Sequence, residues 1–210
     1  MKNKHDIRID RKKLHPWLNY KLGLLLKKCA ENGIYLIITE GFRTKEYQDS
    51  LYAKGRTKPG KIVTNAPGSS YSSQHQLGIA FDIAINDSKL LYNDELIRKV
   101  AKIAKSKKVG LKWGGDWKSI VDTPHFYLGK WGSTTKKLMS TYGSFEKFKK
   151  TWTGTVKCNT YLRKGKAFTS KRILTIKKGK EVRILWKSKV LRIAKVEYGG
   201  KYGYIRLKNL

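Results

Sequence analysis

The chain has 210 residues, enough for one large domain or two small ones, and its 40% hydrophobic content suffices for a real core. It has 47 Lys and Arg against 15 Asp and Glu, a formal net charge of +32 at pH 7. Such a surface favours polyanionic partners: nucleic acid, an anionic membrane or an anionic cell wall. Cys29 and Cys158 are too far apart in sequence to form a metal-binding pair, which argues against a disulfide framework and against a cysteine-ligated zinc.

The N-terminal segment 1–20 contains no apolar run of signal-peptide length, and no run of about 18 apolar residues occurs anywhere. We therefore expect a protein made in a cytoplasm without a secretion signal of its own. The first predicted helix has Pro16 in its first turn and stops at Gly33. Its apolar face comprises Leu18, Leu22, Leu25, Leu26 and Cys29.

Helical and strand patterns alternate up to about residue 150. Residues 34–39 are predicted as a buried strand and residues 45–55 as a short helix. In residues 80–85 (AFDIAI) the alternation directs Phe81 into the core and leaves Asp82 on the opposite face, between alanines. Residues 93–110 are predicted as an amphipathic helix that Gly110 stops. Its apolar face comprises Leu96, Val100, Ile103 and Ala104.

After Thr153 the helical period disappears, and short β-rich runs are separated by turns rich in Gly and Lys. We therefore expect an α+β domain at residues 1–132, a helical connector at 133–153 and a small β-barrel at 154–210. Residues 151–210 hold 17 Lys and Arg against 2 Asp and Glu, a balance of +15, whereas the rest of the chain holds 30 against 13, a balance of +17. The charge per residue is therefore about twice as high in residues 151–210 as in the rest of the chain. We expect the C-terminal part to be the anchor on a polyanion.

Two histidines and an aspartate make a candidate metal site. His75 and Asp82 lie seven positions apart in the stretch SSQHQLGIAFDIAI, which carries little other charge, and His125 follows in DTPHF. Catalytic zinc usually takes three nitrogen or oxygen side chains and leaves a fourth position for water. A single core-adjacent histidine is common in proteins, so the prediction of a zinc site depends on the combination.

Asp122, three residues before His125, is the candidate for the base that takes a proton from the attacking water. Pro124 disfavours a helix here, so a strand is predicted to start near it, with Asp122 on the entering turn. A bulge or bend must then bring Asp122 to His125. Asp116 is the alternative base, although an aspartate in GGDW more simply bonds the backbone amides of a turn.

The segments around these residues resemble a known enzyme family. Ser73, His75, Gly78, Ala80 and Asp82 fit the S-x-H-x-x-G-x-A-x-D pattern of the zinc D-alanyl-D-alanine peptidases, and DTPHF fits the second histidine segment of that family. Residues 40–48 (EGFRTKEYQ), 51–68 and 113–126 look like one subgroup, the L-alanyl-D-glutamate endopeptidases of phage endolysins and related bacterial wall hydrolases. The resemblance covers roughly residues 15–128.

This resemblance implies an α+β fold with zinc on a small antiparallel sheet, bound by His75, Asp82 and His125. It implies that Asp122 is the general base, where the broader family mostly has Glu, and that Arg43 polarises the scissile carbonyl. Ser73 is expected either to bind a substrate carboxylate or to brace the ligand turn. The further candidates for substrate contact are Gln48, Trp113 and Asp116.

The C-terminal part resembles a bacterial SH3-like wall-binding domain. KKGKEVRIL (177–185) and YGGKYGYIRLKNL (198–210) match the closing strands of such domains, whereas TYLRKGKAF (160–168) replaces their usual LNVRSGPS segment. The resemblance suggests an aromatic surface that stacks on peptide or glycan. Its candidate members are Tyr161, Trp186, Tyr198, Tyr202 and Tyr204.

These features predict an endolysin: a zinc endopeptidase that cuts between L-alanine and D-glutamate of the peptidoglycan stem peptide. It would stay in the host cytoplasm until lysis, depend on a holin-like partner for release, and bind peptidoglycan and anionic wall polymers, without nucleic acid and without stable membrane insertion. One alternative is a D,D-carboxypeptidase acting on D-Ala-D-Ala termini. The other is a non-catalytic basic binder of wall or nucleic acid, although neither basic region shows a recognition helix or an RNA-binding sheet motif.

Overall fold

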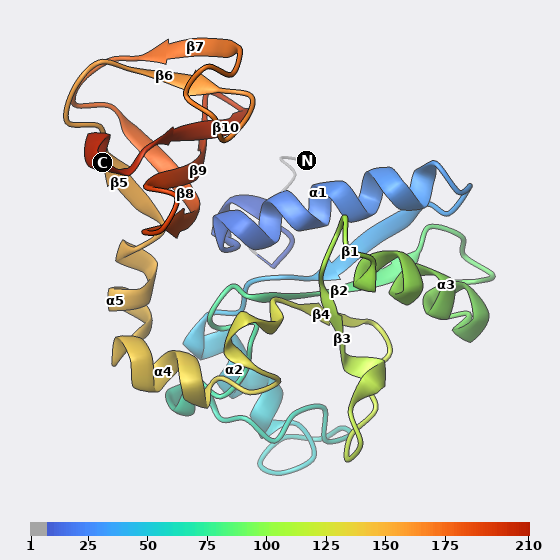
Figure 1. The fold of residues 1–210 in the computed structure, drawn as a ribbon. Helices are drawn as coiled ribbons and strands as arrows, with labels where there is room; N and C mark the ends of the chain where they lie inside the picture. The colour runs from blue at the N-terminus through green and yellow to red at the C-terminus, as the bar shows by residue number, and fades with distance from the viewer. Residues whose placement is uncertain (1–7) are drawn as a thin grey trace, which may run out of the picture. The chain divides into compact units, whose positions relative to one another are not determined.

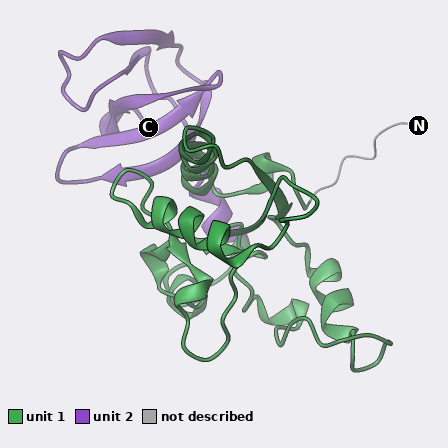
Figure 2. Cartoon of the chain, turned by 90° about the vertical axis from the view of Figure 1, so that its right-hand side faces the viewer, with its two compact units in different colours: residues 1–145 green, residues 146–210 purple. Residues whose placement is uncertain are grey.

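The computed structural model describes residues 8–210, so the first seven residues of the segment searched for a signal peptide lie outside it. The chain forms two compact units, residues 1–145 and 146–210, which Figure 2 colours green and purple. The boundary falls within the predicted connector 133–153, which contains α4 (Lys136–Tyr142) and α5 (Phe145–Lys150). No helix within residues 8–210 has the length and apolar character needed to cross a bilayer.

The first unit is built on a small antiparallel sheet whose strands lie in the order β1-β2-β4-β3. Three helices accompany this sheet, and α3 contacts α1, β2 and β3 (Figure 1). This arrangement confirms the predicted α+β class. The strands are β1 (Leu36–Glu40), β2 (Ala80–Ile85), β3 (Lys112–Trp113) and β4 (His125–Tyr127), and the helices are α1 (Pro16–Ala30), α2 (Lys45–Ala53) and α3 (Asp94–Lys105).

The pairing of β2 with β4 separates a core face from a polar face. Phe81 lies opposite Phe126 in the register, and their rings stack at 5.9 Å between centroids with both side chains fully buried. Asp82 lies opposite His125, one position later than Phe81 in β2 and one position earlier than Phe126 in β4. Because successive side chains of a strand point to opposite faces, the phenylalanine pair anchors the sheet in the core and turns Asp82 and His125 to the other side.

Helix α1 confirms the predicted start, apolar face and stop. Pro16 occupies its first turn, and Nδ1 of His15 accepts a hydrogen bond from the backbone N–H of Trp17. After the last turn Gly33 adopts a φ of 72°, a left-handed conformation that favours glycine. The fully buried members of the predicted face are Leu18, Leu22, Leu25 and Cys29, whereas Leu26 is only partly buried.

Three details of the predicted elements were wrong. Helix α3 ends at Lys105, five residues before Gly110, because the chain bends there and buries Val109 in the core. Its buried face is rotated by one residue from the predicted one and comprises Ile97, Val100, Ala101 and Ala104. Strand β1 is an edge strand and not a buried one: Tyr35, just before it, is 63% exposed and Ile37 is 39% exposed.

The second unit contains a six-stranded antiparallel sheet in the order β5-β8-β9-β10-β6-β7. This confirms the predicted all-β C-terminal part, while its closure into an SH3-like barrel stays a prediction. The strands are β5 (Thr153–Thr155), β6 (Thr160–Arg163), β7 (Arg172–Ile176), β8 (Glu181–Ser188), β9 (Ile193–Tyr198) and β10 (Lys201–Arg206). Their core comprises Val156, Leu162, Ile176, Val182, Ile184, Ala194, Val196 and Ile205.

Candidate metal centre

Three side chains converge on the polar face of the β2–β4 pair. His75 comes from the turn before β2, where its carbonyl oxygen accepts a hydrogen bond from the N–H of Gly78. Nε2 of His75 lies 3.2 Å from Nδ1 of His125 and 3.3 Å from Oδ1 of Asp82, and the latter two atoms are 3.0 Å apart. The sequence therefore brings together three ligand atoms from positions as far as 50 residues apart.

The outer nitrogen of each imidazole is already engaged. Nδ1 of His75 donates to the carbonyl oxygen of Gly41 at 2.8 Å, and Nε2 of His125 donates to Oε1 of Gln74 at 2.8 Å. A proton on these outer nitrogens leaves the lone pairs of the inner ones for a cation. Both rings are buried, so these hydrogen bonds fix their orientation.

The site fits zinc. Two imidazole nitrogens and one carboxylate oxygen form a set of three protein ligands that leaves a fourth position open. Ligand atoms at two corners of a tetrahedron with bonds of roughly 2.0–2.1 Å lie about 3.3 Å apart. The separations of 3.0–3.3 Å between the three ligand atoms therefore leave room for one ion at bonding distance from all of them.

The ligands also have the charge states that a metal requires. Burial alone would favour a protonated Asp82, but the two neighbouring imidazoles, His75 and His125, hold its pKa well below the usual range. Burial lowers the pKa of His125 and keeps that ring neutral at pH 7. A carboxylate and a neutral imidazole are the forms that bind metal, so this part of the site needs no proton removed before an ion enters.

Asp122 lies beside the three ligands, on the bend that its predicted role required. Its Oδ2 atom is 4.0 Å from Nδ1 of His125, and its carbonyl oxygen accepts a hydrogen bond from the backbone N–H of His125 at 3.3 Å. Burial raises the pKa of the Asp122 carboxyl. The bend requires Gly114, because a Cβ atom there would lie only 2.6 Å from the carbonyl oxygen of Asp122.

Arg43 enters the site from the end of β1. The Nη2 atom of its guanidinium lies 3.7 Å from Oδ2 of Asp82, and its Nε atom lies 3.7 Å from Oε2 of Glu40. Glu40 points here because the β1–β2 register shifts between Ile38 and Glu40, a bulge of the kind that redirects side chains near active sites. Arg43 is thus held between two carboxylates at the edge of the cavity.

A cavity of about 530 Å³ opens over these residues. The sequence-predicted residues that line it are Arg43, Ser73, His75, Asp122 and His125. Gln48 does not: it is fully buried, its amide nitrogen donates to the carbonyl oxygen of Ala66 at 2.9 Å, and its oxygen accepts from Arg43 at 3.4 Å. Gln48 therefore supports Arg43 and the loop at residues 62–66.

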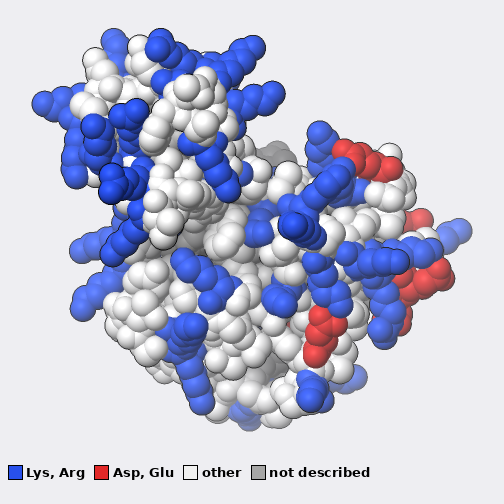
Figure 3. All heavy atoms as spheres, viewed as in Figure 1, with Lys and Arg blue, Asp and Glu red and all other residues white. Residues whose placement is uncertain are grey.

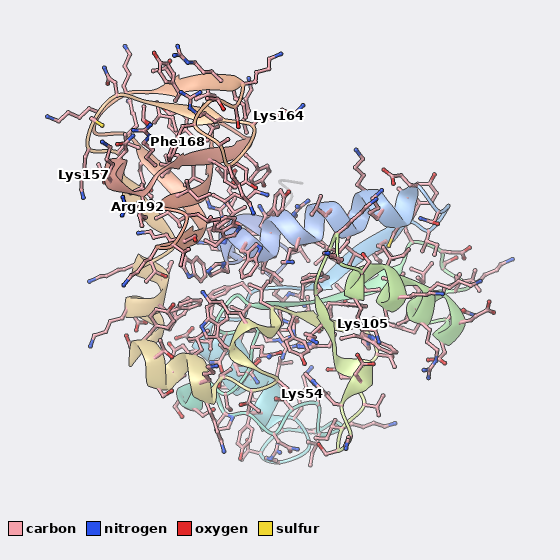
Figure 4. All side chains as sticks on the ribbon, viewed as in Figure 1. Lys54, Lys105, Lys157, Lys164, Phe168 and Arg192 are labelled. Atoms are coloured by element: carbon pink, nitrogen blue, oxygen red, sulfur yellow. The ribbon has the colours of Figure 1, made fainter. Side chains whose placement is uncertain are left out.

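Trp113 and Asp116, expected to contact substrate, lie outside this cavity. Trp113 is only 5% exposed, and its indole N–H donates to the carbonyl oxygen of Thr123 at 2.7 Å. Asp116 binds Lys105, labelled in Figure 4, with an Nζ–Oδ1 distance of 2.9 Å. Trp113 holds the chain that leads to Asp122, and Asp116 forms an ion pair between α3 and the turn after β3, so substrate contact by either residue stays a prediction.

Sequence reasoning missed Gln74 and Trp117. The ring of Trp117 lies 5.0 Å from the ring of His125 and its indole N–H donates to the hydroxyl of Tyr127 at 3.1 Å, so it forms the aromatic wall that Trp113 was expected to form. Both tryptophans stand in the motif WGGDW, whose pattern does not distinguish them. Gln74 stands next to His75, but its partner His125 is 51 positions away, beyond any local signal.

Comparison with known proteins assigns the chain to a family. Residues 67–128, which contain all three ligands, match the profile of a family described as D-alanyl-D-alanine carboxypeptidase. Over 126 residues the chain is 40% identical to the peptidoglycan L-alanyl-D-glutamate endopeptidase CwlK of Bacillus subtilis (strain 168), with 55% of this chain and 73% of that protein aligned. The chain belongs to the M15 peptidase family.

This M15 peptidase also aligns with a phage protein and with solved structures. The L-alanyl-D-glutamate peptidase of Listeria phage A118 is 32% identical over 127 residues, which are 57% of this chain and 41% of the phage protein. The chain thus spans about two fifths of that relative. Among solved structures, the Serratia marcescens L-Ala D-Glu endopeptidase ChiX aligns with a TM-score of 0.43 and 22% identity, over 56% of this chain and 82% of that one.

Family membership and geometry agree on the chemistry. The M15 peptidase carries a His75–Asp82–His125 metal site inside the matched segment, and it is a zinc metallopeptidase, as predicted. The alternative of a non-catalytic basic binder is therefore set aside.

Proposed function

We propose that this M15 peptidase hydrolyses the bond between L-alanine and D-glutamate in the peptidoglycan stem peptide. One observation carries the proposal: the His75–Asp82–His125 site shares its cavity with Asp122 and Arg43. The relative CwlK of Bacillus subtilis is named for that activity. It is 40% identical to this chain, and the alignment covers 73% of its length. A metal site with an adjacent carboxylate and guanidinium has the groups that amide hydrolysis requires.

Asp122 is the general base in this proposal. When bound, zinc supplies a Lewis acid at the scissile carbonyl and lowers the pKa of water. Asp122 accepts the proton of the attacking water and later delivers it to the leaving nitrogen. Its raised pKa suits both steps, because a carboxylate with a higher pKa accepts a proton more readily and still releases it to an amine.

Arg43 and Ser73 orient the substrate. The guanidinium of Arg43, at the cavity edge, donates N–H groups to the carbonyl oxygen as negative charge develops there. Gln48 and Glu40 act through Arg43, since each lies against its guanidinium and fixes its position. Ser73 lines the same cavity beside His75 and is placed to bind a carboxylate of the stem peptide.

Mass spectrometry of digested, purified cell walls tests the scissile bond. Cleavage between L-alanine and D-glutamate creates new amino termini on D-glutamate and releases no free D-alanine. The description of the matched family favours a second candidate, a D,D-carboxypeptidase. Release of D-alanine without new D-glutamate amino termini would establish that candidate and contradict the endopeptidase.

We further propose that residues 154–210 form an SH3-like barrel that binds the wall, and that the whole protein acts as an endolysin. The support is an all-β unit with a balance of +15 over residues 151–210. An endolysin would wait in the host cytoplasm until a holin-like partner opens the membrane. Production of the protein in a susceptible host should therefore cause lysis only when a holin is produced with it, and lysis without any membrane-permeabilising partner would contradict this role.

A further inference from the structure

The C-terminal unit contains a second cavity, of about 300 Å³, whose chemistry differs from that of the metal centre. It lies between the loop that joins β6 to β7 and the strand β10 with the residues that follow it. Phe168, labelled in Figure 4, stands on that loop. Because every lining residue belongs to residues 158–209, the cavity is complete within this unit.

The lining of this cavity is cationic. Arg163, Lys166, Arg206 and Lys208 line it, and its lining contains neither Asp nor Glu. Residues 151–210 have only two acidic side chains, Glu181 and Glu197, and Glu197 is paired with Arg183 at 3.2 Å. The face of the unit shown in Figure 3 is likewise rich in Lys and Arg and displays no Asp or Glu. An anion entering the cavity would therefore meet attraction from four cationic side chains and no acidic side chain in the lining.

Two aromatic rings in the lining stack with guanidinium groups. The guanidinium carbon of Arg206 lies 4.0 Å from the centre of the Phe168 ring, and that of Arg172 lies 3.8 Å from the centre of the Tyr161 ring. Such stacking uses the face of the guanidinium and leaves its N–H edge available for a bidentate bond to an oxyanion. Phe168 is nonetheless 41% exposed, more than a ring with only a structural role requires.

The cavity has a fixed floor. Ile193 and Ile205 are almost fully buried beneath it, and the amide of Asn209 donates to the hydroxyl of Thr160 at 2.7 Å. Arg163 donates to the carbonyl oxygen of Ser170 at 2.8 Å and thereby holds the β6–β7 loop that forms one wall. The cations are thus arranged around a preformed hollow, unlike lysines scattered on a surface.

We infer that this cavity binds one repeat unit of an anionic phosphodiester polymer of the bacterial cell wall. The phosphate would lie against Arg206 and Lys208, and the attached polyol or sugar against Phe168 or Tyr161. The cavity is larger than a phosphate alone requires, and the surrounding excess of cations suits a polymer that repeats its charge. The choice of a wall polymer over nucleic acid rests on the proposed function, because a peptidoglycan hydrolase finds its substrate among wall polymers.

Sedimentation with purified walls tests the inference, with the full-length Asp122→Asn protein as the background so that the walls stay intact. Arg206→Gln with Lys208→Gln should weaken binding about ten-fold, because two charge-assisted contacts to phosphate are lost. The matched control is Lys187→Gln with Lys189→Gln, which removes the same charge from exposed positions outside the cavity. It should weaken binding less than about three-fold, since only the diffuse attraction changes.

Two further arms identify the ligand. Phe168→Ser leaves the charge unchanged and should still weaken binding several-fold by removing the ring that contacts the polyol or sugar. Walls stripped of phosphodiester polymers with hydrofluoric acid should bind the parent protein and the cavity variant equally weakly. Short poly(glycerol phosphate) should compete with intact walls, and single-stranded DNA of equal charge should compete far less.

Three outcomes would overturn the inference: equal losses in the cavity and control pairs, undiminished binding to stripped walls, or equal competition by DNA. Cleavage of a soluble stem peptide is measured separately, with proteins that carry the same substitutions but keep Asp122. It should be unchanged, since the cavity lies outside the catalytic unit. If the peptide is not cleaved by any of these proteins, the proposed function fails while the binding result stands.

Discussion

His125 is held by contacts at both of its ring nitrogens, and this double engagement makes the metal centre sensitive to single substitutions. Its Nδ1 atom faces His75 and Asp82, and its Nε2 atom donates to Gln74. We expect His75→Ala or His125→Ala to lose zinc and all lytic activity, because two protein ligands hold the ion poorly. Metal content by atomic spectroscopy and a wall lysis assay check this. A variant that keeps both full zinc and lysis would refute the ligand assignment.

Gln74 is expected to affect metal affinity without touching the metal. Gln74→Leu removes the acceptor of the Nε2 proton of His125 and should weaken zinc binding roughly 10- to 100-fold, the range for loss of a hydrogen bond behind a metal ligand. Gln74→Glu keeps an acceptor oxygen and should retain most of the affinity. Competition with a zinc-chelating dye measures both variants. Equal affinity in Gln74→Leu and the parent protein would show that the hydrogen bond is dispensable.

Asp122 should affect turnover and not metal. Asp122→Asn is expected to keep zinc and fold but to lower kcat on the order of 10²-fold or more, because the amide cannot take a proton from water. Asp116→Asn is the matched control, since Asp116 lies outside the cavity and pairs with Lys105. Steady-state cleavage of a soluble stem peptide distinguishes the two. The reverse result, with Asp116→Asn inactive, would mean that the roles of the two aspartates have been exchanged.

At the scale of elements, Arg43 is held between the end of β1 and the start of α2. The Thr44 hydroxyl accepts a hydrogen bond from the backbone N–H of Tyr47 at 3.1 Å and so caps α2 one residue after Arg43. Thr44→Ala should lower the free energy of unfolding by about 1 kcal/mol, the usual cost of losing such a cap. Denaturant titration measures this loss, and Thr44→Ser, which keeps the hydroxyl, should restore the stability. Equal stability in Thr44→Ala would show that α2 does not depend on the cap.

Elements with local signals were predictable from the sequence. The start and apolar face of α1 follow from Pro16 and a 3.6-residue period, and the alternation in β2 placed Asp82 on the polar face. The end of α3 was not predictable from the local sequence, because the burial of Val109 depends on the rest of the core. The exposure of β1 likewise depends on its place at the edge of the sheet, which no local pattern encodes.

The same division between local and long-range information applies to the site. The three metal ligands stand in recognisable motifs, so the sequence predicted them together, while the role of Asp122 stays a prediction. Trp113 and Trp117 stand four positions apart in one motif, and only the fold decides that Trp113 is buried while Trp117 lines the cavity. The acceptor role of Gln74 arises only when β4 pairs with β2, which brings His125 next to the turn that carries Gln74.

At the scale of the whole molecule, the residues of the proposed mechanism all precede residue 146, while the charge density is highest after residue 150. A chain that ends at Lys150 should therefore still cleave a soluble stem peptide. It should lose much of its activity on intact walls, since tethering raises the effective concentration of an enzyme at an insoluble substrate. Parallel assays on soluble peptide and whole walls measure the two effects, and full wall lysis by the shortened chain would contradict the anchor role.

The isolated residues 154–210 provide the complementary measurement. They should bind walls at low salt, and part of this binding should disappear as the screening length falls from ~10 Å at 0.1 M to ~3 Å at 1 M salt. Binding that persists at 1 M would report contacts other than diffuse charge, such as those of aromatic rings. A fragment that stays in the supernatant at low salt would indicate that the wall is not its partner.

The pairing of Asp82 with His125 and of Phe81 with Phe126 has a consequence for how the enzyme matures. A slip of β4 by one residue would turn His125 into the core and Phe126 towards the cavity, because successive side chains of a strand alternate between faces. Such a misaligned chain would lack a complete ligand set, so capture of zinc is restricted to molecules with the correct alignment. During refolding, zinc uptake should therefore occur only after β2 and β4 have paired in the correct register.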